Sequence, residues 1–196
     1  SDYVGALYTR VKSLTNGIYG SVFCAEDALS DAELFDENVI VDLSRASAME
    51  TKSLLMGILV MKLQEYRMCG SEMNSRLRHV TVLEEAHNLL RKTSAEQSQE
   101  SANVQGKSVE MLANAIAEMR TYGEGFIIAD QAPGLLDVSV IRNTNTKIIL
   151  RLPDEEDRKL VGKSAGLKEA QIDELSKLPL GVAAVYQNEW PEAVLC

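Results

Sequence analysis

The sequence has few cysteines, no long apolar stretch and little positive charge. Its three cysteines are scattered without a CxxC pair, so neither a disulfide framework nor a zinc cluster is supported. The longest apolar run, Leu54–Met61, is far too short to span a bilayer, and residues 1–14 lack the basic, apolar and small-residue pattern of a signal peptide. We therefore expect a cytoplasmic protein with no membrane span in this chain.

The charge balance limits how the chain could hold nucleic acid. A formal net charge of −9 argues against a broad surface that grips nucleic acid by charge alone, but it leaves room for a narrow basic lining inside a ring. With 45% hydrophobic and 25% charged residues, the 196-residue chain can form one substantial core. One compact domain, or a piece of one, is expected.

The spacing of apolar residues predicts helices and strands that alternate along the chain. Helices are expected at Tyr3–Leu14, Thr51–Met68 and Val109–Tyr122, and strands at Asn38–Leu43, Val80–Leu83, Gly125–Asp130 and Thr146–Leu152. Ser47 and Glu50 fit a capping box, and the helix that follows them is apolar almost all round, so it should be buried. The order strand, helix, strand implies a parallel sheet with helices on its faces.

The chain divides on this plan into an N-terminal helix with a connecting segment, residues 1–37, and a core, residues 38–196. Within the core, residues 92–108 lose their apolar content and are expected to form a polar mobile loop. A terminal hairpin is expected to pair Gly181–Tyr186 with Glu192–Leu195.

The stretch HVTVLEEAHNLL carries the strongest chemical signal. A short β-branched run ends in Glu84 and Glu85, and the carboxyl ends of parallel strands are where crevices open in α/β sheets. Two neighbouring acids there suit one metal ligand and one base that orients water. The alternative is that both acids only begin a helix, where the helix dipole favours them.

Four blocks, NVIVDLS, HVTVLEEAHNLL, IAEMRTYGEGFIIADQAP and VIRNTNTKIILRL, occur in an order that resembles the HerA-like ATPases. These are P-loop motor proteins that include FtsK-type DNA translocases and the ATPases of type IV secretion systems. The resemblance covers roughly residues 38–186. It implies an α/β fold with a mostly parallel RecA-like (ASCE P-loop) sheet flanked by helices.

The resemblance implies a role for each acid. Glu84 would help to hold Mg²⁺ through its water shell, and Glu85 would position and activate the attacking water. Gln131 matches the family's polar sensor, which hydrogen-bonds the γ-phosphate or the water; as a single residue it could equally be a turn residue.

Arginines complete the implied site. Arg120 matches the arginine that HerA-like rings project into a neighbouring subunit's nucleotide, although a cation at a helix carboxyl end is also favoured by the dipole alone. Arg142 and Arg151 are weaker candidates for contacting nucleotide. Family members often carry Arg where this chain has Ala132, so any role of that arginine is absent here.

Other motifs are weaker. His87 follows Glu84 at a Glu-x-x-His spacing that resembles half of a di-iron site, but such a site needs a second copy, so a hydrogen-bonded structural or coupling role is favoured. Two GKS triplets, 106–108 and 162–164, lack the earlier glycine of a Walker A motif and follow no strand. We reject both as phosphate loops.

A P-loop ATPase needs a glycine-rich loop and a lysine around the phosphates, and the sequence shows neither. Family members carry this Walker A element upstream of the NVIVDL strand, so the simplest account is the carboxyl-terminal part of a longer ATPase. The P-loop strand of the family lies between the sensor strand and the next one. Its absence predicts either that Gly125–Asp130 pairs directly with Thr146–Leu152 or that another chain fills the gap.

The resulting hypothesis is an ATPase that uses ATP and Mg²⁺ to move DNA, or a secretion substrate, through a homo-oligomeric ring, a hexamer in the family, with a nuclease as a possible partner. Alone, the chain should be almost inactive. Two alternatives stay open. One is a degenerate ATPase-fold interaction module that uses no nucleotide. The other is a metal-dependent hydrolase in which Asp42 and Asp130, at neighbouring strand ends, join Glu84, Glu85 and His87.

Overall fold

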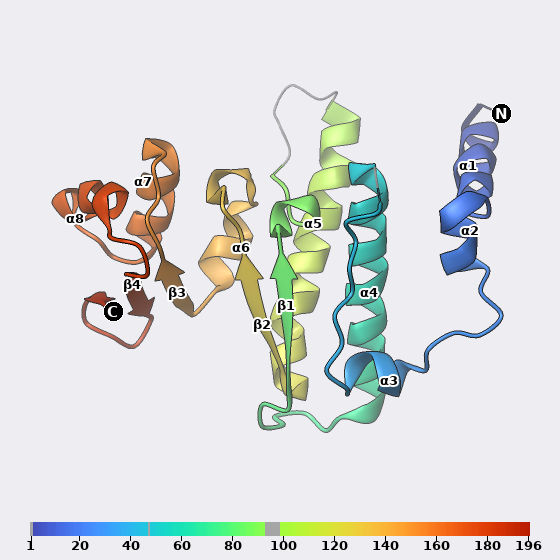
Figure 1. Cartoon of the computed structure of the whole chain (residues 1–196), viewed down its shortest axis with the longest axis horizontal. Coiled ribbons are helices and arrows are strands. Elements are labelled where there is room, and N and C mark those ends of the chain that lie inside the picture. The colour runs from blue at the N-terminus through green and yellow to red at the C-terminus, as the bar shows by residue number, and fades with distance from the viewer. Residues whose placement is uncertain (1, 47, 93–98) are drawn as a thin grey trace. The chain divides into compact units, whose positions relative to one another are not determined.

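The computed structural model describes residues 2–46, 48–92 and 99–196. The chain forms two compact units, Ser1–Ile40 and Val41–Cys196. The first contains helices α1 (Asp2–Ser13), α2 (Gly17–Phe23) and α3 (Asp31–Phe35) (Figure 1). The helix expected at Tyr3–Leu14 is therefore present, as α1.

Helix α3 begins where a capping box satisfies its first backbone groups. The Ser30 hydroxyl accepts a hydrogen bond from the Glu33 N–H, and the Ser30 N–H donates to the Glu33 carboxylate at 2.9 Å. The hydrogen bonds from the Ser30 side chain and backbone lower the pKa of Glu33. This acidic segment therefore contains a short helix with a capped N-terminus.

Two parallel strands form the centre of the second unit. Strand β1 (His79–Glu84) pairs in step with β2 (Glu124–Ala129), so that Glu84 lies opposite Ala129. The connection between them is helical, with α5 (Gln99–Met119) followed by the 3₁₀ turn η2 (Arg120–Tyr122). Gly123 ends this helical stretch with φ +84°, a left-handed conformation that glycine adopts without a steric cost.

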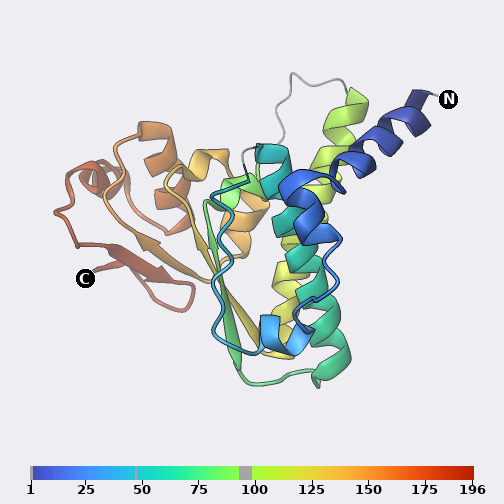
Figure 2. The ribbon, with the colours of Figure 1, turned by 45° about the vertical axis from the view of Figure 1, so that its right-hand side comes forward.

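Helices cover only one face of this strand pair. Helix α4 (Met49–Gly70) lies beside α5, and both run along the same side of β1 and β2 (Figure 2). Leu83 is buried, whereas Val80, Val82 and Ile127 are 41%, 52% and 54% exposed. Because Val82 and Ile127 are register partners, these three side chains form an uncovered apolar face on the other side of the sheet.

The C-terminal part of this unit has its own sheet and core. Strand β3 (Thr146–Ile149) pairs antiparallel with β4 (Ala184–Gln187), and β4 pairs with β5 (Val194–Leu195), which confirms the expected hairpin. The helical elements of this region are η3 (Pro133–Leu135), α6 (Val138–Asn143), α7 (Glu155–Ser164), α8 (Glu169–Glu174) and η4 (Leu175–Lys177). A buried cluster packs the end of α7 and the η4 region against β3 and β4: Ile149, Ala165, Leu175, Leu178 and Ala184.

The two sheets are separate. Strand β2 pairs with β1 alone and β3 with β4 alone, and no other described strand lies between β2 and β3 (Figure 1). The direct pairing of Gly125–Asp130 with Thr146–Leu152, one of the two expected solutions, is not formed. The fold is α/β with a small parallel sheet and flanking helices, as predicted, and its central sheet is incomplete.

Two predicted elements differ from the structure. Asn38–Leu43 forms no strand, and Ile40 is 95% exposed. A short β-branched run becomes a strand only where a partner completes its ladder, and β1 pairs only with β2. The expected loop 92–108 is helical from Gln99 onward, because polar residues can continue a helix without an apolar period; residues 93–98 lie outside the described part.

The start and the burial of α4 also differ from expectation. Its N-cap is Ala48, without a side-chain cap, while Ser47 of the expected capping box lies outside the described residues. Within α4 the buried residues are Val60, Leu63 and Arg67, while Leu54 and Ile58 are 40% and 37% exposed. The helix contacts its neighbours along one stripe, and its other apolar residues face an open side.

A buried carboxylate ties α4 to the start of both strands. Glu124, only 1% exposed, accepts a hydrogen bond from Arg67 Nε at 2.8 Å. Its other oxygen lies 2.8 Å from His79 Nδ1 and accepts a bond from the Thr81 hydroxyl at 2.7 Å. Such a pair is stable only when both charges are present, because a lone buried charge is costly.

Glu124→Gln should therefore lower the free energy of unfolding by about 3 kcal/mol, since it removes one charge of the buried Arg67–Glu124 ion pair. Urea denaturation followed by circular dichroism measures this change. Glu72→Gln, at an exposed position, serves as the control and should change stability by less than about 0.5 kcal/mol. Equal stability of the two variants would contradict the assigned role of Glu124.

Candidate functional site

The candidate site begins where β1 ends. Glu85 follows the strand with φ +49° and ψ +49°, a left-handed conformation that residues with a side chain adopt rarely and at a cost of about 1 kcal/mol. The chain then turns into η1 (Ala86–Asn88). The Glu85 carbonyl accepts hydrogen bonds from the backbone N–H and the side-chain amide of Asn88, both at 2.9 Å. These two bonds stabilise the bend.

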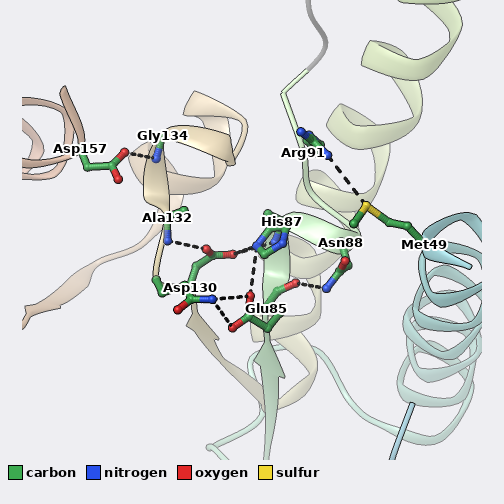
Figure 3. A network of polar contacts seen from close by, with 10 residues as sticks. Met49, Glu85, His87, Asn88, Arg91, Asp130, Ala132, Gly134 and Asp157 are labelled. Atoms are coloured by element: carbon green, nitrogen blue, oxygen red, sulfur yellow. Dashed lines mark hydrogen bonds and ion pairs between the residues drawn. The ribbon is translucent and has the colours of Figure 1, made fainter. Parts of the chain in front are cut away.

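Gln131 meets Glu85 across the ends of the two parallel strands. Its side-chain amide donates a hydrogen bond to Glu85 Oε1 at 3.1 Å and lies 3.4 Å from Oε2 (Figure 3). The register places Glu84 opposite Ala129, so the residues that follow each strand emerge at the same edge. The structure thus brings together two of the residues that the sequence predicts.

Asp130 is the most enclosed member of this site, with a side chain only 3% exposed. One carboxylate oxygen accepts the backbone N–H of His87 at 2.8 Å and lies 2.9 Å from His87 Nδ1. The other accepts the backbone N–H of Ala132 at 2.9 Å. Because a carboxylate only accepts hydrogen bonds, His87 Nδ1 must be the donor, which fixes the ring's tautomer.

The prediction for His87 was a hydrogen-bonded structural or coupling residue, and the contact with Asp130 matches it. His87 Nδ1 also lies 3.5 Å from Glu85 Oε2. From the sequence, Asp130 is expected only as a metal ligand of the alternative function, a metal-dependent hydrolase. Its position directly before Gln131 was the available signal, but nothing in the sequence indicates a contact across 43 residues.

The site is anchored to both neighbouring layers. The Ser53 hydroxyl of α4 donates a hydrogen bond to the Asn88 carbonyl. On the other side, the Gly134 N–H donates to Asp157 of α7 at 2.7 Å (Figure 3). A side chain at position 134 would collide with the Asp157 carboxylate, so glycine is required for this close approach.

Glu84 differs from Glu85 in its surroundings. It is exposed, on the same face of β1 as Val80 and Val82, and its side chain has no hydrogen bond or ion pair with the rest of the described chain. The Glu85 side chain is 45% exposed. Two accessible carboxylates at one strand end offer the oxygen donors that Mg²⁺ prefers, so the donor set fits that ion.

The three predicted arginines lie apart from the carboxylates. Arg120 begins η2 next to Gly123, and therefore lies at the amino-terminal edge of β2, opposite to the edge that holds Gln131. Arg142 is in the last turn of α6, and Arg151 follows β3. All three are exposed, and none of their side chains forms a hydrogen bond or ion pair with another described residue.

Both GKS triplets lie inside helices, 106–108 in α5 and 162–164 in α7. Backbone N–H groups inside a helix are already hydrogen-bonded, so these triplets cannot cradle a phosphate, and their rejection from the sequence stands.

An apolar cleft of about 800 Å³ lies beside the site, between α4, α5 and the residues after η1. Its walls include Leu54, Ile58, Met61 and Met111, and His87 contributes to its lining. Glu85 and Gln131 are not part of that lining. His87 therefore lies between the carboxylate site and the cleft.

No family model matches the sequence, but parts of the sequence are similar to curated HerA helicases. Over 111 residues, 56% of this chain, it is 34% identical to the DNA double-strand break repair helicase HerA of Sulfolobus acidocaldarius. Over 84 residues, 42% of this chain, it is 33% identical to the probable DNA double-strand break repair helicase HerA of Methanocaldococcus jannaschii. The matches cover 20% and 17% of these proteins, so the chain spans about a fifth of the curated relatives that it matches.

Among solved structures, the genome packaging NTPase of Sulfolobus turreted icosahedral virus 2 in complex with ATP-gammaS is similar in fold. The TM-score is 0.56 at 13% identity, over 86% of this chain and 71% of that chain. The likeness defines the class: the fold is an incomplete form of the P-loop NTPase fold. The sequence matches then narrow the class: over the matched residues this chain is similar to HerA proteins, and the resemblance to HerA-like motor ATPases is confirmed.

No helix of the described chain combines the length and the apolar character that crossing a membrane requires.

Proposed function

We propose that this chain supplies the hydrolytic residues of a P-loop ATPase that couples ATP hydrolysis to the movement of DNA. The observation that carries the proposal is the hydrogen bond between Glu85 and Gln131, at the carboxyl ends of two neighbouring parallel strands. This is the edge at which α/β sheets bind their ligands. An acid held against an amide there can orient a water molecule for attack on a phosphate.

Each residue has a distinct part in this proposal. Glu85 orients and activates the attacking water, and Gln131 holds the Glu85 carboxylate and senses the γ-phosphate. Glu84, accessible and without a partner among the described residues, holds Mg²⁺ through its water shell. When bound, Mg²⁺ would offset negative charge on the phosphate oxygens.

The missing part of the site corresponds to the missing part of the fold. The sheet is interrupted between β2 and β3, and the face formed by Val80, Val82 and Ile127 is uncovered. A strand and helix that carry a phosphate loop would fill the gap and cover this face. We propose that they come from a segment outside these 196 residues or from another chain, and that the chain alone binds nucleotide poorly and turns over almost none.

The position of Arg120 suits an action between subunits. It is exposed at the sheet edge opposite Glu85, so it cannot serve the site of its own chain and is available to a neighbour in a ring. We propose such a ring, a hexamer as in the HerA-like family. Arg142 and Arg151, also exposed, are the proposed further contacts to nucleotide.

The proposed substrate is DNA, since the names of the relatives describe a DNA repair helicase and a genome packaging NTPase. A net charge of −9 places any DNA contact on a restricted lining rather than on the general surface. A secretion substrate is the alternative cargo. A nuclease partner and a cytoplasmic location complete the proposal.

A second function, metal-dependent hydrolysis, is favoured by one observation. Glu85, His87 and Asp130 each place a possible ligand atom within 4.8 Å of the others. The hydrogen bonds oppose it, because Asp130 already accepts three N–H donors and His87 Nδ1 is one of them. A metal would have to displace that proton, so the ATPase is the better-supported function.

Glu85→Gln should reduce ATP turnover by about 100-fold or more while ATP affinity stays the same, because the amide still accepts hydrogen bonds but no longer serves as a base. The measurement requires a version of the protein that includes a P-loop segment, with steady-state hydrolysis and nucleotide binding compared. Glu110→Gln, exposed on α5, is the control. Unchanged turnover in Glu85→Gln would rule out Glu85 as the base.

Arg120→Ala should lower turnover by about 1,000-fold with little change in affinity, because a charge that stabilises the transition state is lost. Mixing Arg120→Ala and Glu85→Gln subunits tests whether the arginine acts between subunits. Some mixed interfaces then combine an intact base with an intact arginine, so the mixture should exceed the turnover of either variant alone. Arg76→Ala, on the same sheet edge, is the control, and no recovery on mixing would contradict action on a neighbour.

The purified chain, without nucleotide, should contain far less than one metal ion per molecule. Elemental analysis by mass spectrometry measures the ratio. A ratio near one that is lost in His87→Ala would instead support the metal-dependent hydrolase.

A further inference from the structure

Besides the contact of Gln131 with Glu85, the side chain of Asp130 links the two loops that carry these residues. Asp130 lies after β2, yet one of its oxygens is occupied by two donors from His87 in the loop after β1. Its other oxygen accepts the Ala132 N–H, within its own loop. With a side chain only 3% exposed, it makes these bonds away from competing water, where each is stronger than at the surface.

The conformation of Glu85 needs such support. A left-handed residue with a side chain is strained, and it persists only where its surroundings determine it. The bend at Glu85 places the η1 turn next to Asp130, and the contact of both His87 donors with Asp130 requires that turn to stay formed. Without it, the chain after β1 could relax toward a regular conformation, and the Glu85 carboxylate would leave Gln131.

We propose that Asp130 is a positioning residue for Glu85, acting through His87. This inference rests on the proposed role of Glu85 as the base and adds a residue to that site. Asp130 touches neither the attacking water nor the phosphate in this proposal. Its carboxylate fixes the tautomer of His87 and the η1 turn, and the turn keeps Glu85 against Gln131.

A purely local role accounts for only part of the geometry. An aspartate often accepts the N–H two residues ahead of it to form a tight turn, and the bond to Ala132 is of this kind. Asp137 does the same with Ser139, at 2.9 Å, and among the described residues its carboxylate otherwise accepts only the Ser139 hydroxyl. The two His87 donors distinguish Asp130, and they make Asp137→Asn a matched control.

The first test uses the 196-residue chain and the nitrogen spectrum of its two histidines. At a pH where the ring is neutral, NMR should show His87 with its proton on Nδ1. Asp130→Asn should shift His87 toward the Nε2-protonated form, because the amide no longer offers two accepting oxygens. His79, which contacts Glu124, should not change and serves as the internal reference. An unaltered His87 in Asp130→Asn would overturn the proposal.

The second test measures turnover in a version of the protein that includes a P-loop segment. Asp130→Asn should lower kcat by about 10- to 100-fold while KM for ATP changes by less than about threefold, since a displaced base affects the chemical step. In the Glu85→Gln background it should cause no further loss, because both changes remove the same contribution. Asp137→Asn should leave kcat within about twofold.

The outcomes separate the two proposals. If Glu85→Gln has no effect on turnover, the proposed function fails, and the NMR result still reports whether Asp130 fixes His87. If Glu85→Gln acts as expected but Asp130→Asn raises KM in parallel, lowers kcat independently of Glu85, or matches Asp137→Asn, then Asp130 is structural and the inference is wrong.

Discussion

The candidate site depends on the register of two parallel strands, and the contacts of the buried Glu124 carboxylate stabilise that register. Its oxygens contact Arg67 of α4 and both His79 and Thr81 of β1. A shift of one residue would separate these partners and turn every side chain of the strand to the opposite face. The opposite ends of the strands would then no longer place Glu85 beside Gln131. A charge network at one edge of the sheet thus sets the geometry of the site at the other.

The carboxylates at the two ends of the β1–β2 pair differ in burial and in hydrogen-bond partners. Glu124 is enclosed and paired with positive or hydroxyl donors, so its role is to hold elements together. Glu84 and Glu85 are accessible, and Glu85 contacts the Gln131 amide and lies 3.5 Å from His87 Nδ1. Their accessible oxygens can be reached by a water molecule or a metal ion. This contrast separates the structural acid from the acids to which we assign chemistry.

Local signals in the sequence were sufficient for much of the fold. β1, β2, β3 and the terminal hairpin follow from short apolar runs bounded by turn residues, and Gly123 marks the end of the helix before β2. The prediction of a strand at Asn38–Leu43 was wrong because pairing depends on a partner that the sequence cannot show. The start of α5 at Gln99 was missed because residues 99–108 carry no apolar period.

The candidate site, like the fold, could be predicted from the sequence only in part. Glu85 and Gln131 could be paired from the sequence because each follows a strand and parallel strands end at a common edge. The contact of Asp130 with His87 could not be predicted from the sequence. It depends on a left-handed backbone conformation at Glu85, and glycine or asparagine is the usual residue in that conformation. The roles of the three arginines stay predictions, because their positions in space depend on neighbours that no spacing encodes.

The separation of β2 from β3 also has a consequence for assembly. A strand added between them must form ladders with two edges that belong to different sheets, so its contacts are far apart in sequence and form slowly compared with local helices. Until that strand arrives, both edges expose unpaired backbone groups beside an apolar face, and such edges attract other chains. The yield of intact protein would therefore depend more on chaperones, or on rapid association with the strand that pairs with β2 and β3, than on the stability of either sheet alone.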